Sequence, residues 1–313
     1  MDQLEILQLG SIPEWDLNAL KEVYTVHTVP KGEDPIALVG DRADKIRGMS
    51  VGGAPVGRAL MESFPNLGIV SVFGVGYDSV DVAAATDLKI RVTNTPDVLT
   101  EEVADFGFGM LIAAARNIVG GDAYVRSGRW GREGAMAFQK PVHGKKIGIL
   151  GLGRIGKAVG RRCAACNMDI AYTNRSKRDD VDWRYEPDAV KLAEWSDYFM
   201  IVLPGGPETK HAVDKAVIEA VGPEGFLINI SRGSTVDEEA MIQALQSGKL
   251  GFAALDVFEN EPNIDPRFLT LDNVLLQPHQ ASATTETRQA MGKLMRDNLA
   301  AFFAGNDLLT PVA

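Results

Sequence analysis

The sequence predicts a two-domain α/β protein in which each domain is built around a parallel sheet. Short apolar runs typical of strands alternate with helical stretches, first over the initial hundred residues and again from Lys145 onward. The apolar runs after Lys145 are nearly continuous, as in strands that are buried on both faces of a sheet. A chain of 313 residues is long enough for two domains of ordinary size.

The first domain begins with a series of short strands, and a long helical pattern follows them. Apolar runs predict strands at residues 4–9, 24–29, 36–40, 49–53, 67–74 and 90–95. A helix is expected around Asp16 to Glu22. A single long helix is then expected from about Thr100, a plausible N-cap, to Gly128, where it leads into a new domain.

The second domain repeats the alternation with greater regularity. Strands are expected at residues 146–150, 169–173, 197–203, 226–231, 252–257 and 273–278, and helices at 154–166, 189–195 and 237–246. A closing helix at 283–304 leaves only a short tail after it, and we expect it to pack back on the first domain. The predicted domains are therefore 1–98 together with 283–313, and 99–282.

Composition excludes several classes of function. The formal net charge is −10, which disfavours a nucleic-acid partner held by a basic face. Two cysteines cannot build a disulfide framework, and the first ten residues lack the features of a signal peptide, so a reducing cytoplasm is expected. No uncharged apolar run approaches the about 18 residues of a membrane span, and we expect neither a membrane partner nor a metal site.

A glycine-rich loop lies between the predicted strand at 146–150 and the helix that follows it. The loop reads GLGRIG and consists of Gly151, Leu152, Gly153, Arg154, Ile155 and Gly156. The first glycine permits a tight turn, the second lets a pyrophosphate approach the backbone, and the third allows close packing of strand and helix. An ordinary glycine turn is the alternative, but the surrounding βα units favour dinucleotide binding.

The residues after the next strand indicate which dinucleotide is bound. An enzyme that selects NAD places Asp or Glu about 20 residues beyond the glycines, where it meets the ribose. Here the chain reads Asn174, Arg175, Ser176, Lys177 and Arg178. These side chains can bind a 2′-phosphate, whereas a carboxylate would repel it. We therefore predict NADP(H) as the preferred cofactor and NAD(H) as the weaker one, with a solvated basic turn as the alternative.

Three side chains with complementary chemistry follow predicted strand ends in the last third of the chain. Arg232, Glu261 and His279 should converge at the carboxyl edge of the sheet, where ligands of open α/β sheets bind. Arginine can clamp a carboxylate, histidine can exchange a proton near neutral pH, and a neighbouring glutamate can orient that histidine. Together they predict hydride transfer to a 2-oxo acid.

Several motifs along nearly the whole chain resemble one family. GLGRIG, INISRG, ALDVFENEP and QPHQAS, with FGVGYDSVD and NTPDVLTEEVAD upstream, are similar to the D-2-hydroxyacid dehydrogenases. The likeness is greatest to the glyoxylate/hydroxypyruvate reductase branch. The resemblance implies a Rossmann doubly wound sheet in the dinucleotide domain, 99–282, and a smaller flavodoxin-like substrate domain, 1–98 with 283–313. It also implies NADPH-preferring reduction of glyoxylate and hydroxypyruvate.

The resemblance assigns roles to individual residues. It implies that Arg232 binds the substrate carboxylate and carbonyl, that Glu261 supports His279, and that His279 protonates the carbonyl oxygen. Further residues implied at the cofactor are Leu203, Pro204, Thr209, Ile230, Ser231 and Asp256. Besides Arg232 and His279, the residues implied at the substrate are Gly52, Val75 and Gly76. The resemblance also implies a homodimer in which Trp130 reaches the substrate site of the partner. Two glycines at 205 and 206 replace bulkier residues usual in the family.

Other interpretations remain open. A corepressor-like protein that senses a dinucleotide would retain the same motifs, and so would a D-2-hydroxyacid dehydrogenase that uses NAD. Cys163 and Cys166 form a CxxC within a predicted helix, where a structural role is favoured over a redox pair or half a zinc site. His27, His143 and His211 are interpreted as structural.

Overall fold

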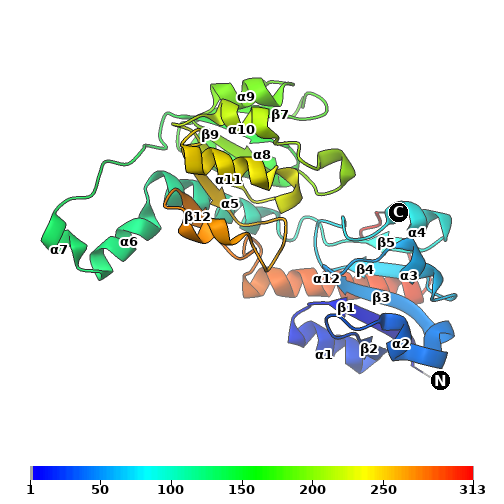
Figure 1. The fold of residues 1–313 in the computed structure, drawn as a ribbon. Coiled ribbons are helices and arrows are strands. Elements are labelled where there is room, and N and C mark those ends of the chain that lie inside the picture. The colour runs from blue at the N-terminus through cyan, green and yellow to red at the C-terminus, as the bar shows by residue number, and fades with distance from the viewer. Residues whose placement is uncertain (1–2, 313) are drawn as a thin grey trace. The chain divides into compact units, whose positions relative to one another are not determined.

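The computed structural model describes residues 3–312, which form two compact units (Figure 1). Unit 1 comprises the chain up to Leu99 together with the segment from Ala283 onward, and unit 2 comprises Thr100–Ser282. Each unit contains one parallel sheet. The α/β fold class with two parallel sheets is therefore confirmed.

Unit 1 is a five-stranded sheet with the order β2-β1-β3-β4-β5. Its strands are β1 (Glu5–Gly10), β2 (Thr25–Thr28), β3 (Ile46–Gly52), β4 (Ile69–Val72) and β5 (Arg91–Thr93). Its helices are α1 (Glu14–Val23), α2 (Pro35–Val39), α3 (Arg58–Glu62), α4 (Val82–Asp87) and α12 (Thr285–Phe303), with the 3₁₀ helix η1 (Gly40–Lys45). This strand order is that of flavodoxin-like sheets. The closing helix α12 contacts β4 and α1, so the chain returns to unit 1.

Unit 2 is a seven-stranded sheet with the order β12-β11-β10-β9-β6-β7-β8. Its strands are β6 (Lys146–Leu150), β7 (Asp169–Thr173), β8 (Arg184–Tyr185), β9 (Tyr198–Ile201), β10 (Phe226–Asn229), β11 (Phe252–Leu255) and β12 (Val274–Leu276). Counted from β6, the order is the 3-2-1-4-5-6 of a Rossmann sheet with a seventh strand added. Every residue of β9 and β10 is buried, as the continuous apolar runs predicted.

The helices of unit 2 lie beside its sheet, except for two that project from it (Figure 1). They are α5 (Thr100–Ala115), α6 (Ile118–Arg126), α7 (Arg129–Glu133), α8 (Arg154–Ala165), α9 (Ala189–Trp195), α10 (Lys215–Val221) and α11 (Glu238–Ser247). The 3₁₀ helices are η2 (Pro207–Thr209), η3 (Gly233–Thr235) and η4 (Pro266–Thr270). Helix α5 packs against α8, whereas α10 packs between α9 and α11. Helices α6 and α7 project from the rest of unit 2 as an arm (Figure 1).

The strand predicted at 36–40 is wrong, because this apolar run forms the helix α2. Asp34 caps the helix by accepting the Ile36 N–H at 3.0 Å, and Pro35 occupies the first helical position. Both are helix-start features. A run of five apolar residues does not distinguish a buried strand from a short helix, so the capping residues decide.

The single helix predicted from Thr100 to Gly128 is also wrong. Helix α5 ends at Ala115, and Asn117 adopts a left-handed backbone with φ 47° before α6 begins. A Cβ at Gly120 would lie 2.2 Å from the Asn117 amide oxygen, so the Asn117 side chain packs closely over that glycine. Within residues 3–312 no single helix is long and apolar enough to cross a membrane, although α5 and α6, bent by 57°, together have the length and composition.

Candidate active site

The glycine loop follows β6 and opens helix α8. Gly151 has φ 100°, and a Cβ there would lie 2.6 Å from the Val202 carbonyl oxygen. A Cβ at Gly156 would lie 2.2 Å from the Gly151 carbonyl oxygen, so the strand and the helix meet too closely for a side chain. Gly153 is the N-cap of α8, and open space lies beside it. The loop therefore fits a pyrophosphate at the helix N-terminus.

The predicted ribose turn follows β7 at the same edge of the sheet. Arg175 and Ser176 are exposed, and Asn174 is half-buried. Arg178 donates from Nε to Asp180 at 3.2 Å, and Lys157 of α8 pairs with the same carboxylate. Hydrogen bonds from Lys157 and then Arg178 lower the pKa of Asp180 to about 2. Arg178 is therefore engaged with a carboxylate, whereas the Arg175 side chain lies at the surface.

The remaining cofactor residues predicted by resemblance lie after β9 and β10. Thr209 in η2 donates from Oγ1 to the carbonyl oxygens of Pro204 and Gly206 at 2.7 and 3.2 Å. These bonds fold the segment that follows β9, in which Leu203 is half-buried. After β10, Ile230 and Ser231 are buried together with Leu152 of the glycine loop. Cofactor contact by these residues stays a prediction.

His279 and Glu261 are hydrogen-bonded to each other. His279 Nδ1 and Glu261 Oε2 are 2.7 Å apart, and Glu261 Oε1 accepts the Phe258 N–H at 2.9 Å. Burial raises the pKa of Glu261, but the hydrogen bond and charge of His279, the Phe258 N–H and the charge of Arg232 outweigh it and hold this pKa below its usual range. Glu261 is therefore an anion at neutral pH, and it orients the imidazole through Nδ1. Nε2 is the ring nitrogen that remains for proton transfer.

Aligned strand ends explain why the three predicted residues converge. In the sheet register Asn229 of β10 pairs with Leu255 of β11, and Leu255 pairs with Leu276 of β12. Arg232 and His279 each follow one of these ends by three residues. Parallel strands that end together direct their following loops to one edge.

The backbone of His279 is held in an unusual conformation by Asp256. His279 has φ 55°, a left-handed conformation that is uncommon for residues other than glycine. Its N–H donates to the Asp256 carbonyl oxygen at 2.9 Å, and the Asp256 carboxylate accepts the N–H groups of Gln280 and Ala281 at 2.7 and 3.1 Å. Asp256 is fully buried, and burial raises its pKa. Sequence reasoning predicted a cofactor contact for Asp256 and missed this support of the histidine turn.

Arg232 is half-buried beside the same pair. Its carbonyl oxygen accepts hydrogen bonds from Asn229 Nδ2 at 3.0 Å and Thr235 Oγ1 at 2.6 Å, which fix the turn after β10. Its guanidinium donates from Nη1 to the Ser231 carbonyl oxygen at 2.8 Å, and its positive charge acts on the Glu261 carboxyl. The structure therefore brings an arginine, a carboxylate and a histidine together at one sheet edge.

The predicted substrate residues of unit 1 lie at the carboxyl edge of its own sheet. A Cβ at Gly52 would lie 2.0 Å from the Ser11 carbonyl oxygen, so this glycine is required for the loops after β1 and β3 to meet. After β4, the Val75 carbonyl oxygen accepts from Asn94 Nδ2 at 2.8 Å, which shapes the turn that includes Gly76. Backbone amides of such a turn can bind an anion. Binding of a substrate carboxylate by Val75 and Gly76 stays a prediction.

Two of the other histidines lie beside glutamates, His143 is exposed, and one of the two cysteines is buried. His27 Nε2 lies 2.7 Å from Glu5 in unit 1, and His211 Nε2 lies 2.8 Å from Glu259 in unit 2. Cys163 is buried in α8, where burial raises the pKa of its thiol to about 12 and suppresses the reactive thiolate. Within residues 3–312, His, Cys, Asp and Glu side chains form no group of three or more that could hold a metal ion.

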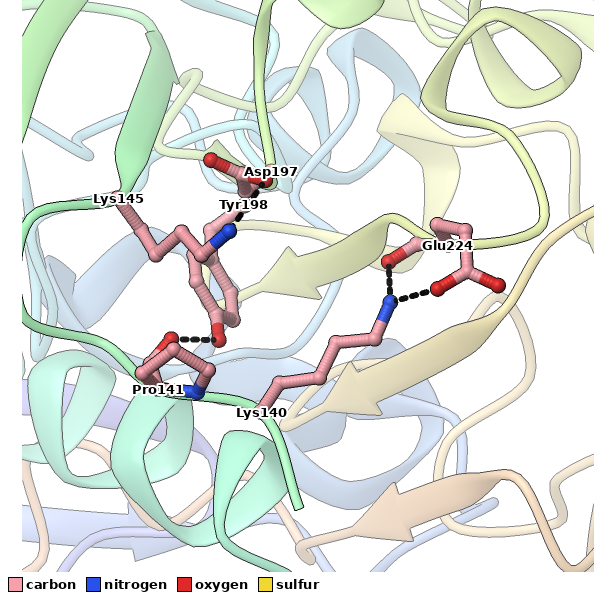
Figure 2. A pocket seen from close by; sticks show the side chains of 6 residues that line it. All are labelled: Lys140, Pro141, Lys145, Asp197, Tyr198 and Glu224. Atoms are coloured by element: carbon pink, nitrogen blue, oxygen red, sulfur yellow. Dashed lines mark hydrogen bonds and ion pairs between the residues drawn. The ribbon is translucent and has the colours of Figure 1, made fainter. Parts of the chain in front are cut away.

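A hollow of about 320 Å³ lies at the opposite, amino edge of the unit 2 sheet (Figure 2). Lys145 pairs with Asp197 across it, Lys140 pairs with Glu224, and the Tyr198 hydroxyl donates to the Pro141 carbonyl oxygen at 2.8 Å. Burial raises the pKa of Tyr198 to about 12, so this phenol stays protonated. The charges of this hollow are matched in pairs, and it shares no residue with the site around His279.

The fold and this site define a dinucleotide-dependent dehydrogenase, and comparison with known proteins supports the same class. A family model described as the NAD binding domain of D-isomer specific 2-hydroxyacid dehydrogenases matches residues 108–281. Glyoxylate/hydroxypyruvate reductase A of Arabidopsis thaliana is 42% identical, with both chains covered fully. This chain belongs to the D-2-hydroxyacid dehydrogenase family, and its cofactor is NAD(P)(H).

Two solved structures extend the similarity to the whole fold. A 2-hydroxyacid dehydrogenase from Ketogulonicigenium vulgare is 51% identical with a TM-score of 0.92, over 100% of this chain and 99% of that one. An NADPH-dependent glyoxylate/hydroxypyruvate reductase from Sinorhizobium meliloti, in complex with NADP and malonate, is 44% identical with a TM-score of 0.94, over 100% and 97%. The family resemblance seen in the motifs is thereby confirmed.

Proposed function

We propose that this protein is a cytoplasmic, NADPH-preferring reductase of small 2-oxo acids, with glyoxylate and hydroxypyruvate as its favoured substrates. The observation that carries the proposal is the hydrogen-bonded Glu261–His279 pair beside Arg232, on the sheet that also bears the glycine loop. The names of its relatives in Arabidopsis and Sinorhizobium support the substrate class. Two free thiols agree with a reducing compartment.

In this proposal each residue acts on one part of the substrate. Arg232 binds the carboxylate and the carbonyl oxygen through its forked donors. His279, held by Glu261, gives the proton from Nε2 to the carbonyl oxygen. The nicotinamide cofactor supplies the hydride to the carbonyl carbon. Glu261 remains ionised and stabilises the protonated imidazole before transfer, and Asp256 keeps the histidine turn in place.

The preference for NADPH is proposed from the turn after β7. Arg175 is exposed at that turn, and Ser176 beside it can donate a hydrogen bond, so both suit a 2′-phosphate. Asp180 already engages Arg178 and Lys157, which leaves Arg175 and Lys177. The forked guanidinium of Arg175 suits a phosphate better than a lysine ammonium does, so Arg175 is expected to contribute most to selectivity. The relative from Sinorhizobium was solved with NADP bound.

One set of steady-state assays tests substrate and cofactor together. We expect the wild-type protein to reduce glyoxylate and hydroxypyruvate with a kcat/KM for NADPH at least about tenfold above that for NADH. Arg175→Ala should raise the KM for NADPH by about tenfold or more and change the KM for NADH by less than about twofold, because one charge-assisted contact is worth about 1.5–3 kcal/mol. Lys249→Ala, at an exposed lysine shortly before β11 and therefore at the amino edge of the sheet, is the matched control.

Equal effects of Arg175→Ala on both cofactors would contradict the assigned selectivity. Absence of turnover with every 2-oxo acid and either cofactor would contradict the function itself, and would favour a dinucleotide-sensing interaction protein instead.

We also propose that the protein is a homodimer that associates through the arm. Helices α6 and α7 bury few of their own apolar side chains: Ile118, Val119 and Val125 are each more than half exposed, and Trp130 is 62% exposed. Phe138, in the segment that returns from the arm, is fully exposed. Apolar area of this kind at a projecting element is typical of a surface that a second copy covers. Trp130 is the residue we propose to reach the partner's substrate.

Sedimentation velocity tests the homodimer. Wild-type protein at micromolar concentration should sediment at twice the mass of the chain, and Val119→Asp with Val125→Asp should shift it toward the single-chain mass, because two carboxylates would be buried at the interface. Lys89→Asp, on the exposed surface of unit 1, is the control. A wild-type protein that sediments as one chain would rule out the homodimer.

A further inference from the structure

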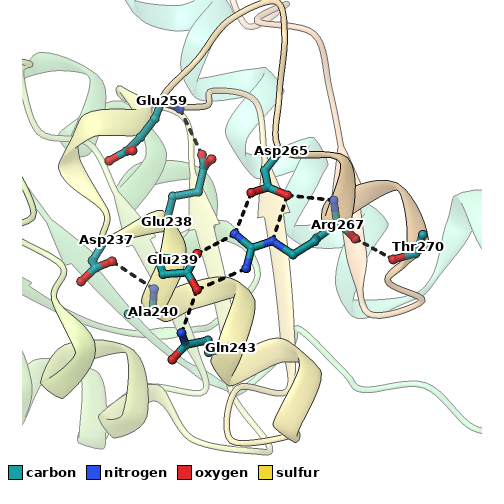
Figure 3. A network of polar contacts seen from close by, with 9 residues as sticks. All are labelled: Asp237, Glu238, Glu239, Ala240, Gln243, Glu259, Asp265, Arg267 and Thr270. Atoms are coloured by element: carbon teal, nitrogen blue, oxygen red, sulfur yellow. Dashed lines mark hydrogen bonds and ion pairs between the residues drawn. The ribbon is translucent and has the colours of Figure 1, made fainter.

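A buried acidic residue outside the predicted site contacts the loop that carries Glu261. Glu238 is the first residue of α11, and it is only 7% exposed. Its Oε2 atom accepts the backbone N–H of Glu259 at 3.0 Å (Figure 3). Glu259 lies two residues before Glu261 and directly after Phe258, whose own N–H donates to Glu261. One hydrogen bond from α11 therefore holds the peptide at the centre of this loop.

The surroundings of Glu238 make a carboxyl group costly there. Burial raises its pKa, the Glu259 N–H lowers it, the carboxylates of Glu259 and Asp265 raise it further, and the charge of Arg267 lowers it. An apolar side chain of similar size would avoid the desolvation cost. The carboxyl at this position is therefore unfavourable by itself, and its hydrogen bond to the loop is the compensating feature.

The same peptide is also packed against the turn that carries Arg232. A Cβ at Gly233 would lie 1.9 Å from the Phe258 carbonyl carbon and 2.3 Å from the Glu259 nitrogen. The Phe258–Glu259 peptide thus contacts both the backbone of Gly233 and the carboxylate of Glu238. A shift of this peptide would move Glu261, because Glu261 Oε1 accepts the Phe258 N–H at 2.9 Å.

We propose that Glu238 is a positioning residue for the Glu261–His279 pair. Its carboxylate holds the Phe258–Glu261 loop against Gly233, so that Glu261 stays within hydrogen-bond distance of His279 and close to Arg232. This role rests on the proposed function, in which Glu261 supports the proton donor. It extends the site to α11, a helix on which the proposed function places no cofactor or substrate residue. A catalytic constellation needs this support because a displacement of about 1 Å can cost about a hundredfold in rate.

The next residue of α11 provides a matched control. Glu239 is exposed, and it binds the far end of the same segment through Arg267, whose Nη2 donates to Glu239 Oε2 at 2.6 Å and to Asp265 Oδ2 at 2.7 Å (Figure 3). These bonds anchor η4, which begins five residues after Glu261. Loss of Glu239 removes an ion pair from the same helix turn without touching the Phe258–Glu259 peptide.

The experiment compares four variants in the full-length protein. Glu238→Leu fills the volume without an acceptor, Glu238→Asp withdraws the acceptor by one methylene, and Glu238→Gln keeps an oxygen that can accept the Glu259 N–H. Leu and Asp should lower kcat for glyoxylate reduction by about tenfold or more, with the KM for NADPH changed by less than about twofold. The Glu238→Gln variant should have a kcat within about threefold of wild type. The Glu239→Ala variant should also keep kcat within about threefold of wild type.

The pH profile gives a readout that a change in stability alone would not move. In the Leu and Asp variants, the pH above which kcat/KM for reduction falls should move lower, because a displaced Glu261 stabilises the protonated donor less. Should Glu238→Leu fail to fold, the Asp variant carries the same expectation. Wild-type kcat and an unchanged profile in the folded Leu or Asp variant would overturn the inference, and so would an equal loss in the Gln variant.

Glu261→Gln, measured in parallel, separates this inference from the proposed function. If Glu261→Gln keeps wild-type turnover, the role of Glu261 itself is wrong. If Glu261→Gln loses turnover and Glu238→Leu does not, only the positioning role of Glu238 fails.

Discussion

His279→Asn is expected to lower kcat for 2-oxo acid reduction by about 10²- to 10⁴-fold while NADPH still binds, because the variant lacks a group that can give a proton to the carbonyl oxygen. Asparagine suits this test for two reasons. It tolerates the left-handed backbone of His279, φ 55°, better than most residues do, and its amide nitrogen can take the place of Nδ1 as a donor to Glu261. The loss should therefore report proton transfer and not a collapsed turn.

His211→Asn is the matched control for this prediction. His211 also has a left-handed backbone, φ 51°, and its ring also contacts a glutamate, at 2.8 Å from Glu259. We expect His211→Asn to keep kcat within about threefold of wild type. Stopped-flow turnover gives kcat, and quenching of protein fluorescence gives the NADPH affinity. Turnover of His279→Asn within tenfold of wild type would show that another group supplies the proton.

Arg232→Ala is expected to lower kcat/KM for glyoxylate by about 10²- to 10⁴-fold, since its two charge-assisted hydrogen bonds, one to the carboxylate and one to the carbonyl oxygen, are worth about 3–6 kcal/mol together. A substrate without a carboxylate isolates this contact. Glycolaldehyde offers the same reacting carbonyl without the anion, so its slow reduction should fall by much less in the variant. A loss of equal size for glyoxylate and glycolaldehyde would contradict carboxylate binding by Arg232.

The same substitution should also change the pH dependence at low pH. Burial raises the pKa of Glu261, and the His279 contacts and the Arg232 charge outweigh this effect. Without Arg232 the pKa of Glu261 should rise, so Glu261 becomes protonated at a higher pH and stops supporting the histidine sooner as pH falls. The acidic limb of the pH profile of kcat/KM should therefore move to higher pH.

Much of the fold could be predicted because local patterns and packing agree. The continuous apolar runs of β9 and β10 predicted strands buried on both faces, and their residues are all buried. Predictions failed where the local pattern allowed two structures. The run at 36–40 has the composition of a strand, but Asp34 and Pro35 begin a helix there. The helix after Thr100 breaks where Asn117 turns left-handed, which apolar spacing does not reveal.

The candidate site also has parts that could be predicted from the sequence and parts that could not. The motifs around Arg232, Glu261 and His279 placed all three at strand ends, because residue type and sequence position suffice for that inference. The left-handed turn held by Asp256 and the support of the loop by Glu238 could not be predicted. Both depend on contacts between segments about 20 residues apart, and neither a buried aspartate nor an acidic helix start has a sequence signal that identifies its hydrogen-bond partner.

By itself, then, the sequence determined the family, the two parallel sheets and the residues of the candidate site, since glycine spacing, apolar runs and strand-end residues are local properties. The tertiary structure alone decided how those groups are held: which oxygen of Glu261 meets His279, why His279 keeps a strained backbone, and why Gly233 admits no side chain. Strand register produced this arrangement, because aligned ends of β10, β11 and β12 bring residues distant in sequence to one edge.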